Sequence, residues 1–132
     1  MRAGRQRVVT LGGSASRPVQ VRVVAGRLPV LPSAVEVVAY AIVREALTNV
    51  VRHAGARGAQ VRFDVDGQLL VVEVTDDGRG LPEAPAAGVG PASMRERAQE
   101  LGGRCTVVPR PHGATLVSAR LPLNQERVDG AD

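Results

Sequence analysis

The chain is poor in aromatic residues and cysteine and has no long apolar run, and each shortage excludes a class of protein. Only 2% of its 132 residues are aromatic, so Val, Leu, Ile and Ala must build the core. Aromatic platforms for stacking nucleic-acid bases are equally scarce. The single cysteine, Cys105, excludes an internal disulfide framework, and its apolar strand context predicts a small core residue. Because no run could span a membrane and no signal-peptide pattern opens the chain, we expect a cytoplasmic domain without membrane contact.

Basic charge is present only as arginine, because the sequence contains no lysine. The 17 basic residues outweigh 13 acidic ones, which gives a formal net charge of +4 and a sequence pI near 10.9. A pI this high is typical of nucleic-acid-binding domains. These arginines, however, are scattered along the chain apart from Arg2, Arg5 and Arg7 at its start, and no series of aromatic residues interleaves with them for base stacking. We therefore interpret the arginine excess as a compositional bias and expect no nucleic-acid ligand.

A chain of 132 residues with 44% hydrophobic and 23% charged residues fits one globular domain with a substantial core. It divides into an arginine- and glycine-rich segment at 1–18, a patterned region at 19–123 and a polar tail at 124–132. Residues 8–11 of the first segment are either a short strand of the fold or the remnant of a linker. The tail has no apolar periodicity and is expected to fray.

Local signals predict the order of helices and strands in the patterned region. Ser33 and Glu36 form a capping box that opens a helix, and the glycines after His53 end it. Asp66-Gly67 lies between two segments of alternating polarity, which is the strongest short signal for a β-hairpin. The expected strands are 19–25, 59–65, 68–75, 104–109 and 114–121, the expected helices are 33–53 and 92–101, and 81–91 is expected to be a loop.

The first expected helix carries polar residues on the face that should meet the core. At about 100° per residue, Glu45, Asn49 and His53 fall within the apolar stripe of the helix, and Arg52 lies at its edge. Burying such groups without partners is costly. We therefore expect them to meet a ligand, a metal ion or a satisfied internal polar network. The oxygen-bearing side chains of Glu45 and Asn49 suit Mg²⁺ better than Zn²⁺.

A second unusual segment, Asp76-Asp77-Gly78-Arg79-Gly80, follows a nearly continuous apolar strand. Asp-Gly pairs are common in turns, so an ordinary turn is one interpretation. The apolar strand, however, places the acidic residues at the edge of the core, where a carboxylate can accept a hydrogen bond from an amino group. The glycines would let a flat ligand approach the backbone closely. Gly88-Val89-Gly90 precedes the second helix, where glycine amides either hold an anion or form a surface loop.

In this order and spacing, the segments resemble the catalytic and ATP-binding domain of two-component sensor histidine kinases, most nearly the nitrate-sensor and DesK-like group. Residues 44–54 resemble the N box, 76–80 the G1 box, and 88–103 the G2 box with the helix after it. Residues 113–115 and 121–123 resemble the closing strands. The resemblance implies the Bergerat fold, an α/β (α+β) two-layer sandwich in which a mixed, mostly antiparallel sheet carries helices on one face.

The resemblance also implies roles for residues of the N box. Asn49 matches the asparagine that binds Mg²⁺, and Glu45 matches the acidic residue that orders the metal and its waters. Arg52 and His53 match positions near the phosphates. These residues form the expected catalytic group, with Asn49 as the metal ligand.

The G1 and G2 boxes are expected to hold the nucleotide. Asp76 matches the aspartate that accepts a hydrogen bond from the adenine amino group, and Thr115 matches a threonine near the adenine edge. The matching glycines are Gly78 and Gly80 in the adenine slot and Gly88 and Gly90 in the lid over the phosphates. Pro91 departs from the family, which commonly has leucine there, and is expected to stiffen the lid or to shift the start of its helix.

The implied function is to bind ATP and Mg²⁺ and to donate the γ-phosphate to a histidine in two-component signal transduction. His53 and His112 do not match the phosphoacceptor, which is expected on a dimerisation domain outside this chain; a response regulator would then receive the phosphate. Parent proteins of this kind are often membrane-anchored. Two alternatives remain open: a serine kinase of the anti-sigma type with the same fold, and a nucleotide- or partner-binding module without transfer.

Overall fold

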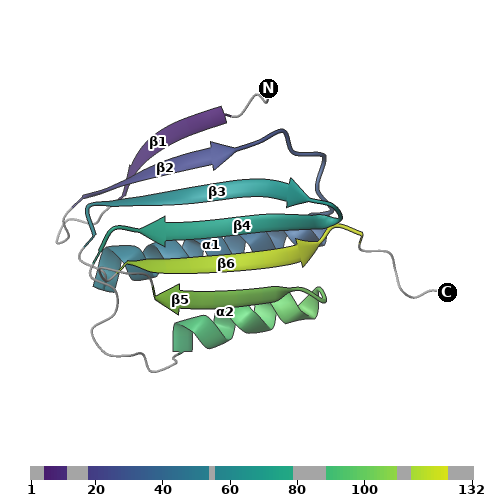
Figure 1. Ribbon diagram of the computed structural model, residues 1–132. Coiled ribbons are helices and arrows are strands. Elements are labelled where there is room, and N and C mark those ends of the chain that lie inside the picture. The colour runs from purple at the N-terminus through teal and green to yellow at the C-terminus, as the bar shows by residue number, and fades with distance from the viewer. Residues whose placement is uncertain (1–4, 12–17, 54–55, 79–88, 110–113, 125–132) are drawn as a thin grey trace.

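The computed structural model describes residues 5–11, 18–53, 56–78, 89–109 and 114–124, which form two layers. Within these residues, one layer is a six-stranded sheet and the other consists of two helices on one face of the sheet (Figure 1). The elements in chain order are β1 (Arg5–Leu11), β2 (Val19–Ala25), α1 (Ser33–His53), β3 (Gly58–Asp66), β4 (Leu69–Asp76), α2 (Val89–Glu100), β5 (Arg104–Pro109) and β6 (Thr115–Pro122). Neither described helix is both long and apolar enough to cross a bilayer.

The sheet is mixed but mostly antiparallel, which confirms the predicted fold class. Its strand order is β1-β2-β3-β4-β6-β5, and among the described strands only β2 and β3 pair in parallel. α1 connects those two strands, because a parallel pair needs a long crossover that packs back onto the sheet. β1 pairs with β2 along its whole length, so residues 5–11 form an edge strand. The tail beyond residue 124 lies outside the described residues.

α1 begins at Ser33 and ends at His53, as the sequence predicted. Its buried stripe runs through Val35, Val38, Ile42, Ala46 and Val50. Glu45 and Asn49 are half-buried at the rim of this stripe and not fully buried within it, so the sequence overestimated their burial. Arg52, predicted at the edge of the stripe, is exposed. Each step of four residues turns the stripe by about 40°, and its later members therefore lie farther from the side of Glu45 and Asn49.

Both hairpin strands beside Asp66-Gly67 form as predicted, and Gly67 adopts the positive φ of 63° that a tight turn requires. α2 differs, because it begins at Val89 and not at residue 92. Gly90 and Pro91 therefore lie in its first turn, where proline is tolerated because the amide there has no helical partner. At the other end, Gly102 has a φ of 80° and its amide donates to Gln99 at 2.9 Å, which ends the helix.

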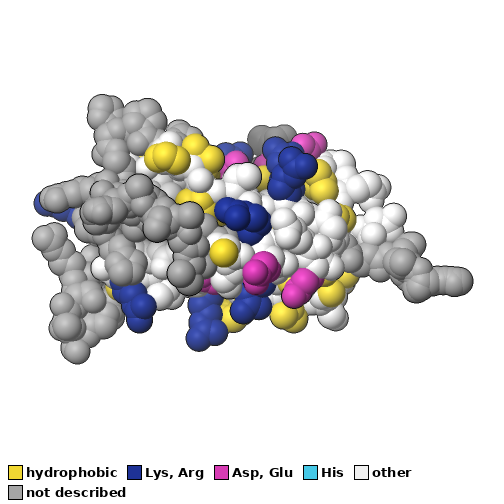
Figure 2. Space-filling model, turned by 90° about the horizontal axis from the view of Figure 1, so that it is seen from below, with side chains coloured by type: hydrophobic (Ala, Val, Ile, Leu, Met, Phe, Trp, Pro, Cys, Tyr) yellow, Lys and Arg dark blue, Asp and Glu magenta, His cyan; other side chains and the backbone are white. Residues whose placement is uncertain are grey.

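The outer side of α2 is charged. Arg95, Glu96, Arg97 and Glu100 are all exposed. Figure 2, which views the molecule from below, shows basic and acidic side chains next to one another along this side. Their signs therefore alternate and form no extended field of one charge.

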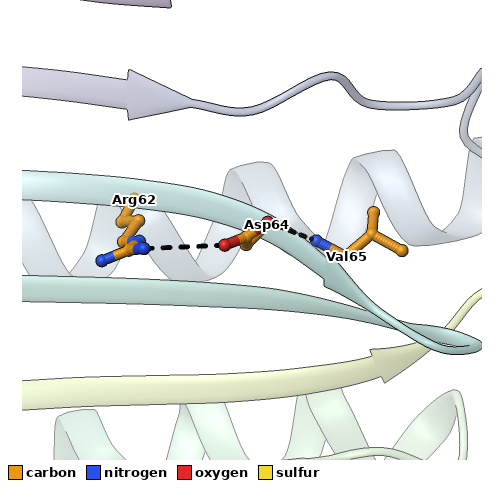
Figure 3. Close-up of polar contacts among 3 residues, drawn as sticks. All are labelled: Arg62, Asp64 and Val65. Atoms are coloured by element: carbon orange, nitrogen blue, oxygen red, sulfur yellow. Dashed lines mark hydrogen bonds and ion pairs between the residues drawn. The ribbon is translucent and has the colours of Figure 1, made fainter. Parts of the chain in front are cut away.

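The two faces of the sheet differ in polarity. The face under the helices holds the core, whose largest fully buried side chains are Ile42, Leu70, Met94, Leu121, Val21, Val35, Val61, Val72 and Val74. The opposite, open face carries ion pairs. Arg62 pairs with Asp64 at 3.6 Å (Figure 3), and Arg120 pairs with Asp66 at 3.7 Å. Because their side chains are at least half-exposed, these pairs contribute at most about 1 kcal/mol each.

Candidate functional site

Asp76 ends β4 on the helix-side face and is buried, with 8% of its surface exposed. Alternation along the strand explains the burial, because Val72 and Val74 share its face. Its Oδ1 atom accepts a hydrogen bond from the Gly78 amide at 2.7 Å. The backbone of Thr115, at the start of β6, bonds to the same carboxyl group. Asp76, Gly78 and Thr115 therefore meet at one end of the sheet.

Burial raises the pKa of Asp76 above its ordinary value of 3.8, because an apolar surrounding disfavours the charged form. Hydrogen bonds from the backbone of Gly78 and of Thr115 lower this pKa, and the nearby charge of Asp77 raises it. Burial is the largest effect, so the pKa of Asp76 is raised overall. A donor from a ligand would stabilise the charged carboxylate and reverse the shift.

We expect the raised pKa to appear in the pH dependence of unfolding. Because the folded-state pKa of Asp76 exceeds that of the unfolded chain, the folded state binds more protons and ionisation costs stability. The contribution of Asp76 should therefore be most favourable below pH 3.8 and should fall as the pH rises through the raised pKa. Urea unfolding at a series of pH values gives the free energy of unfolding of the wild type and of Asp76→Ala. The difference between the two free energies at each pH measures the contribution of Asp76. If the wild type instead became more stable relative to Asp76→Ala as the pH rises, the predicted direction of the pH dependence would be wrong.

The C-terminal half of α1 brings polar side chains toward the same end of the sheet, because the chain continues from it into β3 beside Asp77. Glu45 and Asn49 are half-buried there. Among the described residues, neither side chain makes a hydrogen bond or ion pair. Within the part of the chain that the structure describes, the carboxylate of Glu45 and the amide oxygen of Asn49 are therefore unpaired.

Cys105 lies on β5, the strand that packs against α2. It is 4% exposed, and burial raises the pKa of its thiol to about 11. Arg95 of α2 lowers that pKa and Glu45 of α1 raises it, so charged groups of both helices lie near the thiol. Cys105 is a core residue, as the sequence predicted.

The other predicted site residues are described only in part. Gly90 lies in the first turn of α2, and Arg52 is exposed near the end of α1. His53 ends α1, but its side chain lies outside the described atoms, as do Gly80 and Gly88 entirely. The roles of these residues stay predictions.

Asp77 is a residue of this region that the sequence analysis did not single out. Its Oδ1 atom accepts hydrogen bonds from the amides of Arg57 at 2.9 Å and Gly58 at 3.1 Å. Its own amide donates to the Gly58 carbonyl oxygen at 3.1 Å. Strand alternation predicts that Asp77 points away from Asp76. The amides that it binds belong to the start of another strand, so only the fold reveals them.

These side chains fit a purine nucleotide with a divalent cation. The carboxylate of Asp76 has lone pairs beyond those used by its two backbone donors, and it can accept a further bond from an amino group. Asn49 offers an amide oxygen, a type of ligand that Mg²⁺ accepts alongside phosphate and water. β4 therefore offers an acceptor for an amino group, and α1 offers an oxygen ligand for a cation.

Comparisons with known proteins identify the family to which the chain belongs. The family described as histidine kinase-, DNA gyrase B-, and HSP90-like ATPase matches residues 34–125. The sensor histidine kinase NarS of Mycobacterium tuberculosis is 36% identical over 99 residues, which cover 70% of this chain and 23% of that protein. The sensor histidine kinase YxjM of Bacillus subtilis is 37% identical over 93 residues, which cover 68% of this chain and 23% of that protein. The chain thus spans about a quarter of the length of these relatives.

The solved structures that resemble this chain include a histidine kinase and an ATP binding domain. The blue-light activated histidine kinase of Erythrobacter litoralis EL346 is 31% identical, with a TM-score of 0.70 over 82% of this chain and 36% of that one. The ATP binding domain of PrrB from Mycobacterium tuberculosis, at 23% identity and a TM-score of 0.53, covers 79% of this chain and 78% of that one and shows the shared fold. The chain therefore belongs to the family of histidine kinase-, DNA gyrase B- and HSP90-like ATPases.

Proposed function

We propose that the chain binds ATP with Mg²⁺ and acts as the catalytic domain of a sensor histidine kinase. The observation that carries the proposal is the buried Asp76 carboxylate, which lies beside Gly78 and Thr115 on the helix-side face. A buried acceptor favours a base with an exocyclic amino group, because a base without that donor leaves the acceptor unpaired. The relatives that are named histidine kinases support transfer to a histidine.

The adenine side of the pocket is assigned to the end of β4 and the start of β6. Asp76 accepts a hydrogen bond from the adenine 6-amino group, and Thr115 lies along the edge of the base. The backbone approaches the flat base where side chains are absent. The glycines of this proposal are Gly78 and Gly80 beside the base, and Gly88 and Gly90 beside the phosphates.

The phosphate side is assigned to α1. Asn49 is the protein ligand of Mg²⁺, and Glu45 orders the water around it. When bound, Mg²⁺ neutralises charge on the phosphates. Arg52 and His53 donate to the phosphate oxygens. Phosphoryl transfer depends more on such positioning and charge neutralisation than on covalent chemistry by the protein.

The γ-phosphate passes in this proposal to a histidine of a dimerisation domain, and from there to a response regulator. The domain works on the cytoplasmic side, whether or not its parent protein is anchored in a membrane. Asp76, Asn49 and the glycines bind the nucleotide, so binding does not require the partner domain. Transfer does require it.

The test combines the purified chain, its cognate dimerisation domain and ATP labelled at the γ-phosphate. Label that appears on a histidine of the dimerisation domain, and that is lost in acid as phosphohistidine is, supports the proposal. Label on a serine of an anti-anti-sigma partner would instead indicate the serine kinase. Nucleotide binding without transfer to either partner would indicate a binding module, and the absence of nucleotide binding would contradict every version of the pocket.

A further inference from the structure

The end of β4 holds two successive aspartates with opposite surroundings. Asp76 is buried on the helix-side face. Asp77 is exposed on the open face, where it lines a hollow of about 330 Å³ together with Arg22, Arg57 and Gln60. Successive strand residues share one backbone and point to opposite faces. Contacts that fix the Asp77 side chain therefore also fix the direction in which the Asp76 side chain points.

Three hydrogen bonds hold Asp77 to the start of β3. Its Oδ1 atom binds the successive amides of Arg57 and Gly58 at 2.9 and 3.1 Å, and its own amide donates to the Gly58 carbonyl oxygen at 3.1 Å. Hydrogen bonds from an amide to an ionised carboxylate are stronger than neutral ones. The Arg57 carbonyl oxygen accepts from the Gln20 amide at 3.0 Å, which ties β2 to the same point. Asp77 thus joins the starts of β2 and β3 to the end of β4.

Asp76 has less support of its own. Among the described residues its carboxylate bonds to the backbone of Gly78 and Thr115. Gly78 directly follows Asp77, so its amide moves with the turn that Asp77 holds. If that turn shifts, the 2.7 Å bond from Gly78 to Asp76 lengthens or breaks and the carboxylate is free to rotate.

We infer that Asp77 is a positioning residue for adenine recognition, because it locks the turn after β4 onto residues 57 and 58 and so aims the Asp76 carboxylate at the base. The inference rests on the proposed function, since it requires the adenine amino group at Asp76. Asp77 lies on the other face of the sheet and does not touch the nucleotide. It should therefore govern selectivity for the amino group and leave phosphate binding unchanged.

The test compares the affinities of ATP and of purine riboside triphosphate, which lacks the 6-amino group, both with Mg²⁺. The wild type should prefer ATP by about tenfold or more, because only ATP donates to Asp76. Asp77→Ala should lower that preference to about twofold or less, through weaker ATP binding and nearly unchanged binding of the analogue. Asp77→Asn retains an Oδ1 acceptor for the two amides and should keep most of the preference.

Asp64→Ala is the matched control. Asp64 is also an exposed aspartate of the sheet whose Oδ1 atom accepts a backbone amide, that of Val65 at 3.0 Å, and it lies elsewhere on the open face (Figure 3). This variant should leave both affinities unchanged. If Asp77→Ala does not fold, Asp77→Glu gives the same comparison, because it keeps the charge and moves the carboxylate away by one methylene group.

Two results would overturn the positioning role: an equal loss of affinity for both nucleotides in Asp77→Ala, or a preference for ATP that remains as in the wild type. A wild type that binds neither nucleotide, or both equally well, would overturn the adenine site and the positioning role with it. The wild-type measurement thus separates a failure of the proposed function from a failure of this inference.

Discussion

Replacing Asp76 with alanine is expected to remove most of the thermal stabilisation that ATP with Mg²⁺ gives the protein. Asp76 is buried and is the proposed acceptor for the adenine amino group. A hydrogen bond to a charged group contributes about 1.5–3 kcal/mol, so its loss should weaken binding roughly ten- to hundredfold. At a ligand concentration of about 100 Kd, the stabilisation of about 2.7 kcal/mol would fall to about 0.4 kcal/mol after a hundredfold loss of affinity.

The measurement is the melting temperature with and without ATP and Mg²⁺, at one fixed nucleotide concentration. Asp66→Ala is the control, because Asp66 is exposed and the described contact of its side chain is the surface ion pair to Arg120 at 3.7 Å. Such a pair contributes little to stability, and the nucleotide response should be preserved. An ATP-dependent shift in Asp76→Ala equal to that of the wild type would refute the assignment of the adenine site.

Replacing Asn49 with alanine is expected to lower transfer of the γ-phosphate by about a hundredfold or more, because charge neutralisation by a bound metal is worth several kcal/mol. Asn49 is half-buried on α1, and its side chain makes no hydrogen bond within the described residues. Removing its amide oxygen should therefore act through the metal and leave the fold intact. The same variant should flatten the dependence of ATP affinity on Mg²⁺, since that dependence reports the metal site directly.

Thr48→Ala is the control for this variant. Thr48 is the neighbouring residue of α1, is exposed, and donates its hydroxyl group to the Arg44 carbonyl oxygen at 2.8 Å. Its removal should change neither transfer nor the response to Mg²⁺. The measurements are transfer assays and ATP titrations in Mg²⁺ or in a chelator. If Asn49→Ala, like Thr48→Ala, changed neither transfer nor the Mg²⁺ dependence of ATP affinity, Asn49 would be excluded as the metal ligand.

Elements with short-range signals could be predicted from the sequence. The bounds of α1 follow from the residues at its ends, and the turn between β3 and β4 follows from Asp66 and Gly67. These features depend on hydrogen bonds and φ angles within a few residues, which the local sequence specifies. The mixed sheet was predicted through the resemblance to a family, because pairing between distant strands has no local signal.

The structure differs from the sequence-based predictions mainly in the burial of side chains and in contacts between residues far apart in the chain. α2 begins earlier than predicted, since Pro91 is compatible with a first helical turn and therefore did not mark a boundary. Glu45 and Asn49 are half-buried at the rim of the α1 stripe, because a helical wheel gives their direction but not where the sheet beneath them ends. The role of Asp77 was missed because its partners are 19 and 20 residues away.

The sequence by itself determined the residue types of the candidate site, their order and the local turns and helices that carry them. These depend on side-chain chemistry and on backbone preferences within a few residues. Only the tertiary structure decided that Asp76 is buried beside Thr115, that Glu45 and Asn49 are half-buried with no described partner, and that Asp77 holds the start of β3. Burial and hydrogen-bond partners of this kind depend on which strands lie side by side, and packing of the whole sheet against its helices sets that arrangement.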